Sequence, residues 1–204
     1  WSFMGFDFKV GRGVLIPRDD TEVVVNLCID FLKNRTDKKT VDLCSGSGAI
    51  AVALDKISGA EVTAVEIDET AFTYLETNVK VNNSSVKPVM ADALKICDTF
   101  AYCELDLIFS NPPYIKSADI ETLQKEVRLE PRLALDGGED GYDFYREIVS
   151  RWSRKLKKGG ALAFELGENQ ADAVKALMTD KGFSDFKISL DFGGVQRAII
   201  GTLL

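Results

Sequence analysis

Four consecutive residues, Asn111-Pro112-Pro113-Tyr114, have side chains that can bind a planar polar group and position it for a reaction. They follow the apolar run from Leu105 to Ser110, which the pattern predicts to be a buried strand. Each proline lacks a backbone donor and has a fixed φ, so the chain must leave the sheet there. The result is a rigid polar loop at the carboxyl end of a strand, where ligands bind in open α/β sheets.

This loop suits an amide or a nucleobase amine. The side chain of Asn111 offers one acceptor and one donor group, and Tyr114 adds an aromatic ring beside a stiff backbone. A Pro-Pro turn with a packed tyrosine uses the same residue types. The loop alone therefore favours neither a binding nor a purely structural interpretation.

A second group of residues has the spacing of a nucleoside site. Val41 to Ala51 predicts a strand, a turn containing Gly46 and Gly48, and a helix start whose free amides can face a ligand. Glu66 ends the next predicted strand, 20 residues after Gly46, at the spacing of an acid that binds a ribose diol. Taken alone, the glycines could form only a tight turn, and Glu66 could be only a solvated acid at a strand end. Together they favour a nucleoside-binding site.

Two further features leave alternatives open. Asp92 and Ala93 follow the third predicted strand, where an adenine could lie, although Asp92 could equally cap a helix. The turn from Gly46 to Ala51 also fits Gly-x-Gly-x-x-Ala, the pattern of a dinucleotide-binding oxidoreductase. The spacing does not distinguish these two cofactor classes.

Composition excludes several kinds of chemistry. The 204-residue chain contains no histidine, which excludes a Ser-His triad, a histidine base and a histidine-ligated metal, and we expect no metal site. The net charge of -7 argues against a duplex-binding surface, so we expect a protein or small-molecule substrate and no stable nucleic-acid complex. Four cysteines without a CxxC pair, no visible signal peptide and no membrane-length apolar stretch predict a reduced, cytoplasmic protein without membrane association.

The elements that position these residues alternate between strand and helix. This order predicts an α/β fold with a doubly wound, mostly parallel seven-stranded sheet. Residues 1–18 are expected to form an N-terminal β-hairpin turning at Gly11-Arg12-Gly13, and residues 19–204 the main domain, ending in an antiparallel hairpin. The expected strands are 40–44, 61–65, 87–90, 105–110, 161–165, 185–190 and 196–203, and the expected helices are 21–32, 49–56, 69–82, 142–156 and 169–181.

The order of glycine turn, acidic strand end and Asn-Pro-Pro-Tyr resembles the class I S-adenosylmethionine-dependent methyltransferases that act on planar nitrogen. Within that class the chain resembles the release factor glutamine methyltransferases, which implies a Rossmann-like fold. The stretches that carry this resemblance are Val14 to Arg18 with Thr21-Glu22, Asp42 to Ala51, Glu130-Pro131, Ala134-Leu135, Gly138 to Gly141, and Phe164 to Gly167. Cys44 stands where many members have a glycine. The family's helical N-terminal domain is missing, which suggests a truncated or divergent member.

The resemblance implies S-adenosylmethionine as cofactor, S-adenosylhomocysteine as product, and peptide chain release factors as protein partners. The target is the glutamine of their Gly-Gly-Gln motif. The implied cofactor contacts are Cys44, Ser45, Gly46, Ser47 and Gly48 at the methionine end, Glu66 at the ribose, Asp92 and Ala93 near the adenine, and Asn111. The implied substrate-binding residues are Asn111, Pro112, Pro113 and Tyr114, and we expect the enzyme to be a monomer.

An amide nitrogen is a poor nucleophile because its lone pair is delocalised into the carbonyl. We infer that the Asn111 side-chain oxygen and the Pro112 carbonyl accept the amide hydrogens while Tyr114 packs on the amide plane, so these three are the candidate catalytic residues. Arg18 and Glu22 could contact substrate or cofactor, or form only a surface ion pair. The competing hypotheses are an adenine-N6 nucleic-acid methyltransferase and an NAD-dependent oxidoreductase.

Overall fold

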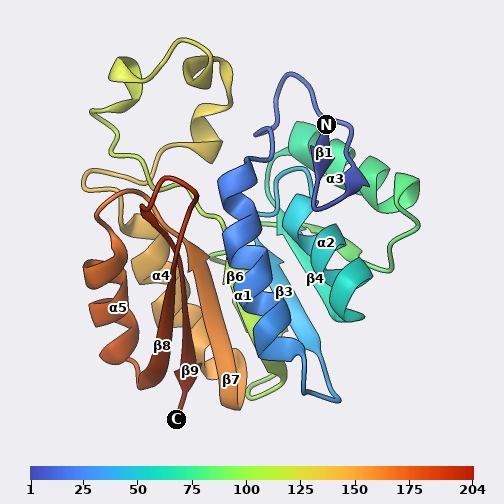
Figure 1. Cartoon of the computed structure of the whole chain (residues 1–204), viewed down its shortest axis with the longest axis vertical. Helices are drawn as coiled ribbons and strands as arrows, with labels where there is room; N and C mark the ends of the chain where they lie inside the picture. The colour runs from blue at the N-terminus through green and yellow to red at the C-terminus, as the bar shows by residue number, and fades with distance from the viewer.

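The computed structural model describes residues 1–204, and its centre is a seven-stranded sheet in the order β5-β4-β3-β6-β7-β9-β8 (Figure 1). Only β9 runs antiparallel to its neighbours. This arrangement confirms the expected doubly wound α/β fold with its terminal hairpin. The strands are β3 (Lys39–Leu43), β4 (Glu61–Glu66), β5 (Lys87–Met90), β6 (Leu105–Ser110), β7 (Leu156–Glu165), β8 (Phe183–Leu190) and β9 (Gln196–Leu203).

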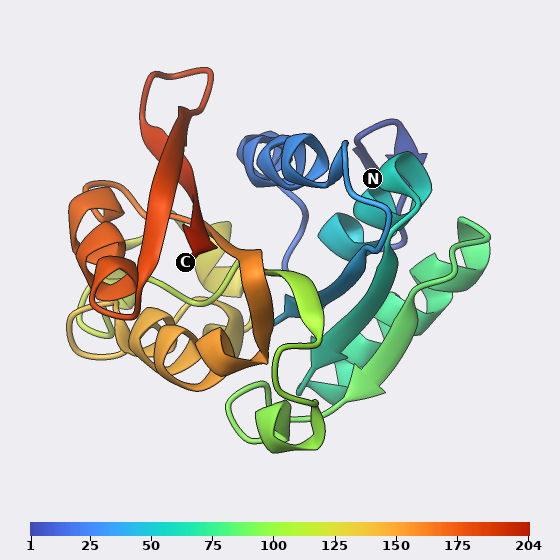
Figure 2. The ribbon, with the colours of Figure 1, turned by 90° about the horizontal axis from the view of Figure 1, so that it is seen from below.

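Helices cover both faces of this sheet, as the view from below shows (Figure 2). Leu107 and Phe109 of β6 point to the face covered by α1 and α2, while Ile108 between them points to the face covered by α4 and α5. This alternation buries β6 on both sides, as expected of a central parallel strand. The helices are α1 (Glu22–Leu32), α2 (Ala49–Ser58), α3 (Glu69–Val81), α4 (Asp143–Trp152) and α5 (Ala171–Thr179).

Helix α4 connects the core to a loop near the carboxyl edge. Tyr145, Ile148, Val149 and Trp152 recur at helical spacing and are all buried, which gives the helix one apolar face. The indole nitrogen of Trp152 donates a hydrogen bond of 2.9 Å to the carbonyl of Ala93. The packing of α4 therefore fixes the backbone at one of the candidate site residues.

The N-terminal hairpin exists but lies earlier in the chain than expected. Strands β1 (Ser2–Phe3) and β2 (Phe6–Asp7) pair across a turn at Met4 and Gly5, both of which have positive φ. Two positive φ values are typical of the tight turns that match strand twist. The chain does turn at Gly11-Arg12-Gly13, but the prediction that strands pair across this turn is wrong, because the rest of residues 8–18 crosses the carboxyl edge of the sheet as irregular backbone.

Element boundaries differ most around β7. The expected helix 142–156 ends at Trp152, and a short 3-10 helix (Ser153–Lys155) leads into β7 at Leu156. The strand begins earlier than expected because Leu156 pairs with Leu105 across an irregularity in the register. No helix of the structure has both the length and the apolar character needed to cross a bilayer.

Candidate active site

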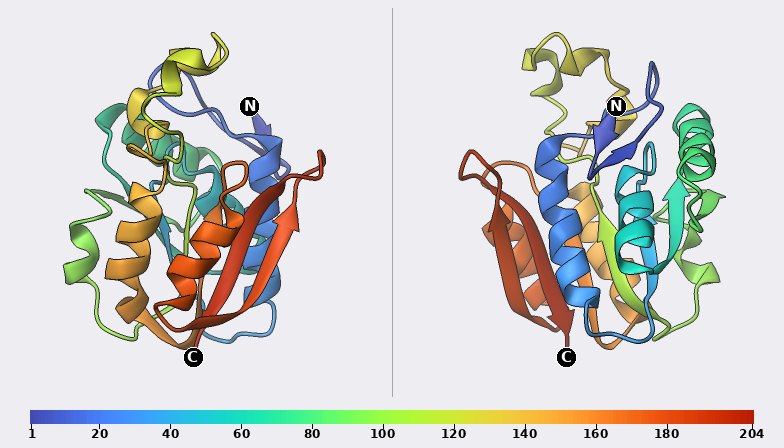
Figure 3. Two further views of the ribbon diagram at one scale, coloured as in Figure 1. Left: turned by 90° about the vertical axis from the view of Figure 1, so that its left-hand side faces the viewer. Right: turned by 45° about the vertical axis from the view of Figure 1, so that its right-hand side comes forward.

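The sheet register brings the predicted site residues to one edge. Leu43, the last residue of β3, lies opposite Val65 of β4 and Ser110 of β6. Cys44 and Asn111, which follow β3 and β6, therefore meet Glu66, the last residue of β4, near the point where the strand order reverses. Such a reversal opens a crevice at the carboxyl ends of the strands, and Figure 3 shows both irregular segments, residues 8–18 and 116–141, gathered above this edge.

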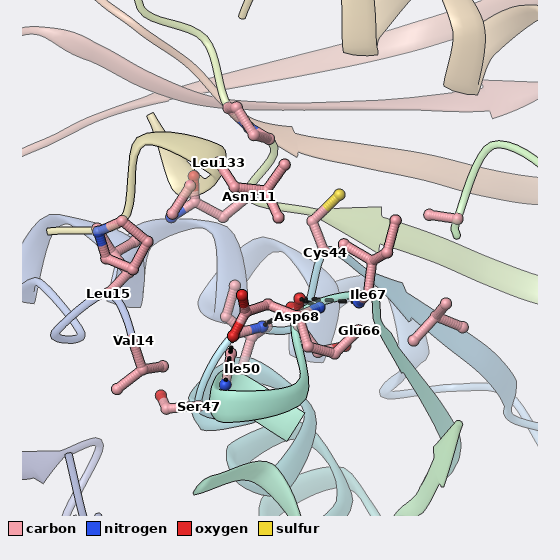
Figure 4. A pocket seen from close by; sticks show the side chains of 18 of the residues that line it. Val14, Leu15, Cys44, Ser47, Ile50, Glu66, Ile67, Asp68, Asn111 and Leu133 are labelled. Carbon is pink, nitrogen blue, oxygen red and sulfur yellow. Dashed lines mark hydrogen bonds between the residues drawn. The ribbon is translucent and has the colours of Figure 1, made fainter. Parts of the chain in front are cut away.

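A cavity of about 310 Å³ occupies this crevice (Figure 4). Its walls contain most of the residues that the sequence singled out, and the close-up shows Asn111, Cys44 and Glu66 around one space. The predicted residues that line it are Cys44, Ser45, Gly46, Ser47, Glu66, Asp92, Ala93, Asn111 and Pro113. The predicted residues outside its lining are Gly48, Pro112, Tyr114, Arg18 and Glu22.

The glycine turn has positive φ at Gly46 and Gly48, which the sequence suggested, and also at Cys44, which it did not. Cys44 and Gly46 both adopt positive φ, at 61° and 55°. An added Cβ at Gly46 would meet no atom within 4 Å, so the glycine is required by its φ and leaves open space at the cavity wall. Gly48 has a different role, since it precedes α2 and an added Cβ there would collide with Leu75 of α3.

The carboxylate of Glu66 organises this turn. Its Oε2 accepts a hydrogen bond of 2.7 Å from the Gly46 amide, and its Oε1 accepts bonds of 2.8 Å from the amides of Ile67 and Asp68. Burial raises the pKa of Glu66, and the backbone bonds offset part of that rise. Because a carboxylate accepts about four hydrogen bonds, Glu66 retains capacity for a ligand hydroxyl.

Asp92 borders the cavity and also caps a backbone turn. It lines the cavity, and its Oδ1 accepts a hydrogen bond of 2.9 Å from the amide of Leu94. Its second oxygen pairs with Lys95 at 3.0 Å. Asp92 thus caps the turn that presents the Ala93 backbone beside the cavity.

The Asn-Pro-Pro-Tyr loop divides its side chains between the cavity and the protein interior. Asn111 is half-buried and points into the cavity, with no hydrogen bond drawn to its side chain (Figure 4). Tyr114 turns away, and its hydroxyl donates a hydrogen bond of 3.3 Å to Glu165. An added Cβ at Gly137 would lie 2.7 Å from the Cα of Tyr114, so the loop backbone is closely packed.

Several further wall residues were not predicted to contact the cofactor or substrate. Val14, Leu15 and Pro17 come from the irregular N-terminal segment, and Pro131, Leu133 and Ala134 from the segment 116–141. Except for Leu133, they lie in stretches that carry the family resemblance, but the resemblance did not assign them a role. Loops of this kind often contribute to binding sites.

Arg18 and Glu22 connect the surrounding segments to one another. Arg18 pairs with Glu130 at 2.7 Å, and the same Glu130 oxygen accepts a bond from the Ile16 amide. Glu22 accepts a hydrogen bond of 3.0 Å from the amide of Met4 in the hairpin turn. Both residues hold irregular backbone in place near the cavity.

Comparison with known proteins agrees with this geometry. Residues 18–130 match the family model described as "Methyltransferase small domain". The chain is 36% identical to a release factor glutamine methyltransferase of Clostridium acetobutylicum, with 98% of this chain and 71% of that protein covered. It is 41% identical to the protein of the same name from Geobacter sulfurreducens, with coverage of 99% and 70%. A third, from Fusobacterium nucleatum, is 40% identical, and the chain spans 57% of its length.

Solved structures share the fold at lower identity. A methyltransferase from Pyrococcus furiosus superposes with a TM-score of 0.70 at 22% identity, covering 97% of this chain and 89% of that one. The hMettl16 catalytic domain, in complex with an RNA hairpin, superposes with a TM-score of 0.77 at 16% identity, with coverage of 98% and 77%. These likenesses show a Rossmann-like fold. The match to the methyltransferase family model implies use of S-adenosylmethionine. On the strength of its identity to the curated relatives, the chain belongs to the release factor glutamine methyltransferase family.

Proposed function

We propose that this enzyme transfers a methyl group from S-adenosylmethionine to the side-chain amide nitrogen, N5, of the glutamine in the Gly-Gly-Gln motif of peptide chain release factors. The observation that carries the proposal is the position of Asn111. Its amide faces the same cavity that the glycine turn and Glu66 line. A planar amide can therefore meet a cofactor there while the rest of the substrate protein stays outside.

The cavity fits the cofactor. Its wall at Gly46 is open where a side chain would project, and Glu66 keeps acceptor capacity for a ribose hydroxyl. We assign Cys44, Ser45, Gly46 and Ser47 to the methionine end and Asp92 with Ala93 to the adenine end. When bound, S-adenosylmethionine supplies an electrophilic methyl group on a positively charged sulfur. We assign Gly48 a packing role against α3 rather than direct contact.

The protein's contribution to the reaction is mainly positioning. The Asn111 oxygen accepts one hydrogen of the substrate amide, and the Pro112 carbonyl accepts the other. These bonds hold the nitrogen in place and favour the form in which its lone pair is less delocalised. The proton that the nitrogen releases after methylation can leave to water, so this scheme needs no histidine.

Other residues of the loop and its surroundings support this arrangement. Pro113 stiffens the backbone and forms part of the wall. Tyr114 acts from behind the loop through Glu165, and Arg18 and Glu22 act by holding the segments that they contact. We further propose that the enzyme works as a cytoplasmic monomer, with residues 19–204 as the methyltransferase domain and residues 1–18 covering its cavity.

Mass spectrometry of a release factor incubated with the protein and S-adenosylmethionine tests the proposal. We expect one added CH₂ unit on the Gly-Gly-Gln glutamine. Asn111→Ala is expected to lower kcat by about 100-fold or more, because a group that acts on the reacting atoms is lost. Asn34→Ala changes an exposed asparagine after α1 and is the matched control.

Two outcomes would point elsewhere. Label from S-adenosylmethionine that appears on RNA or DNA, and not on the release factor, supports the adenine-N6 alternative. Calorimetry that detects NAD binding and no S-adenosylmethionine binding supports an oxidoreductase. A release factor that stays unmodified with both wild type and Asn111→Ala contradicts the glutamine proposal.

A further inference from the structure

Glu165 is a buried carboxyl group immediately behind the Asn-Pro-Pro-Tyr loop. It ends β7, next to Phe164, which lies opposite Ser110 in the sheet register. Only 3% of the Glu165 surface is exposed to solvent. One oxygen, Oε1, accepts the hydrogen bond from the Tyr114 hydroxyl at 3.3 Å, whereas Oε2 is buried without a hydrogen-bond partner.

Burial of an incompletely bonded carboxyl group destabilises the folded state, so stability does not explain its presence. A buried carboxylate needs a partner charge or several hydrogen bonds to offset its lost hydration. Arg197 of β9, whose charge lowers the pKa of Glu165, is already engaged, since it lies 3.0 Å from Asp191 and 3.9 Å from Asp20 and donates to the Leu166 carbonyl. Under-compensated buried acids of this kind cluster at functional sites.

The other polar side chains around Glu165 bond backbone groups and not its carboxyl group. Tyr145 of α4 donates to the backbone carbonyl of Glu165, and Gln170 binds the backbone of Tyr114, Gly141 and Gly167. Burial raises the pKa of Glu165 to about 7, while Thr21, Arg197 and Tyr114 lower it and Asp20 raises it. The bond from the Tyr114 hydroxyl is the direct contact that favours the ionised form.

Tyr114 links this carboxyl group to the substrate loop. Its hydroxyl bonds Glu165, and the residue ends the loop that begins with Asn111. The backbone of Tyr114 is pressed against Gly137, so a shift of its ring is transmitted to the loop. Glu165 is therefore placed to hold the ring of Tyr114, and through it the loop, in one position.

We propose that Glu165 is a positioning residue whose carboxylate holds the hydroxyl of Tyr114 and thereby fixes Asn111 for the substrate amide. The inference rests on the proposed function. An ionised carboxylate accepts the bond from the Tyr114 hydroxyl, but a protonated one loses acceptor capacity and needs a partner for its own proton. The loop is then held only while Glu165 is ionised.

The pH dependence of kcat tests this role. For wild type we expect kcat to fall about tenfold between pH 8 and pH 6, the ratio of ionised fractions across a pKa of about 7. Glu165→Gln keeps an acceptor oxygen but cannot titrate, so its kcat should stay flat over this range. Glu168→Gln changes an exposed glutamate on the following loop and should keep the wild-type profile.

Two further variants test the hydroxyl groups that lower the pKa of Glu165. Tyr114→Phe and Thr21→Val each remove a hydroxyl that lowers the pKa of Glu165, so each should move the midpoint of the profile to higher pH. Because all variants use the same release factor and cofactor, any titration of the substrates is common to them. A Glu165→Gln profile that still falls with acid, or midpoints that do not move, would overturn the proposal.

Urea denaturation separates this role from a purely structural one. The folded-state pKa of Glu165 lies above its unfolded value, so wild type loses stability relative to Glu165→Gln as pH rises from 5 to 8. If this stability difference appears but the wild-type kcat does not change with pH, Glu165 titrates without positioning the loop. The inference about Glu165 would then be wrong, while the proposed function would stand. Absence of methyl transfer by wild type at every pH would instead contradict the proposed function.

Discussion

The side-chain amide of Asn78 donates a hydrogen bond of 2.9 Å to the backbone carbonyl of Ser47 in the glycine turn. Asn78 is fully buried on α3, and it also bonds both backbone groups of Lys9, accepting from its amide at 2.6 Å and donating to its carbonyl at 3.0 Å. One side chain thus joins the cofactor turn to the N-terminal segment. That segment goes on to supply Val14 and Leu15 to the cavity wall.

Replacing Asn78 by alanine should therefore weaken cofactor binding. Each buried backbone group left without a partner costs about 1–3 kcal/mol, so we expect the Kd for S-adenosylmethionine to rise about tenfold or more. Calorimetry on the folded variant measures this. Asn82→Ala is the matched control, because Asn82 bonds the Asp7 carbonyl but not the glycine turn, and it should keep the Kd within about twofold. Equal losses in both variants would contradict the assignment.

Glu66→Gln should also weaken cofactor binding. The substitution turns one carboxylate oxygen into an NH₂ group, which cannot accept a hydrogen bond from an amide. A hydrogen bond to a charged group contributes about 1.5–3 kcal/mol, so the Kd should rise roughly 10- to 100-fold. The exposed Glu69, on the first turn of α3, provides the control Glu69→Gln. An unchanged Kd for Glu66→Gln would exclude the ribose role.

Cys44 is a non-glycine residue in the left-handed region, and its φ of 61° predicts an unusual response to mutation. This conformation costs a residue with a Cβ about 1–2 kcal/mol. Cys44→Gly should therefore match or exceed the stability of wild type, whereas the β-branched Cys44→Val should lose about 1–2 kcal/mol more. Cys97→Gly is the comparison, because Cys97 is buried at an ordinary φ and should be destabilised by the loss of its side chain. Thermal denaturation of the three variants decides between these outcomes.

The burial of Asp42 in β3 should make the protein less stable as pH rises. It is wholly buried, and both carboxyl oxygens lack hydrogen-bond partners. Burial raises the pKa of Asp42 well above its usual range, and the neighbouring Glu66 carboxylate raises it further. Its contribution to stability is thus complete below the unfolded pKa and is lost as pH rises towards the folded pKa.

Asp42→Asn removes this dependence. Relative to wild type, the variant should gain about 1.4 kcal/mol per pH unit wherever only the folded carboxyl keeps its proton. Urea denaturation at pH 5 and pH 8 measures the difference. Asp37→Asn, at an exposed position before β3, should show no such divergence. A constant offset between wild type and Asp42→Asn at both pH values would show that Asp42 does not titrate in this way.

The sequence predicted the part of the site that the sheet builds. Strands such as Leu105–Ser110 are largely apolar and buried, and parallel register brings the residues at their carboxyl ends to one edge. The glycine turn, Glu66 and Asn111 were therefore placed together by secondary structure alone. The α/β order and the terminal hairpin followed from the same patterns.

The rest of the cavity wall could not be predicted from secondary-structure patterns. Val14, Leu15 and Leu133 belong to irregular segments, whose positions depend on individual contacts such as Lys9 with Asn78. The orientation of Tyr114 likewise depends on Glu165, 51 residues later in the chain. Side-chain pairing over such distances has no periodic signature in a single sequence.

The ion pair between Arg18 and Glu130 joins residues 112 positions apart, whereas Gly46 and Glu66 are separated by only 20. Closing a long stretch of chain requires more ordering before any contact forms, so long-range pairs form late in folding. As the chain leaves the ribosome, the glycine turn and Glu66 can meet as soon as β3, α2 and β4 have emerged. The substrate wall must wait for residues beyond β6. We expect newly synthesised protein to acquire its nucleoside pocket first and to become competent for its protein substrate only after the segment that contains Glu130 has emerged.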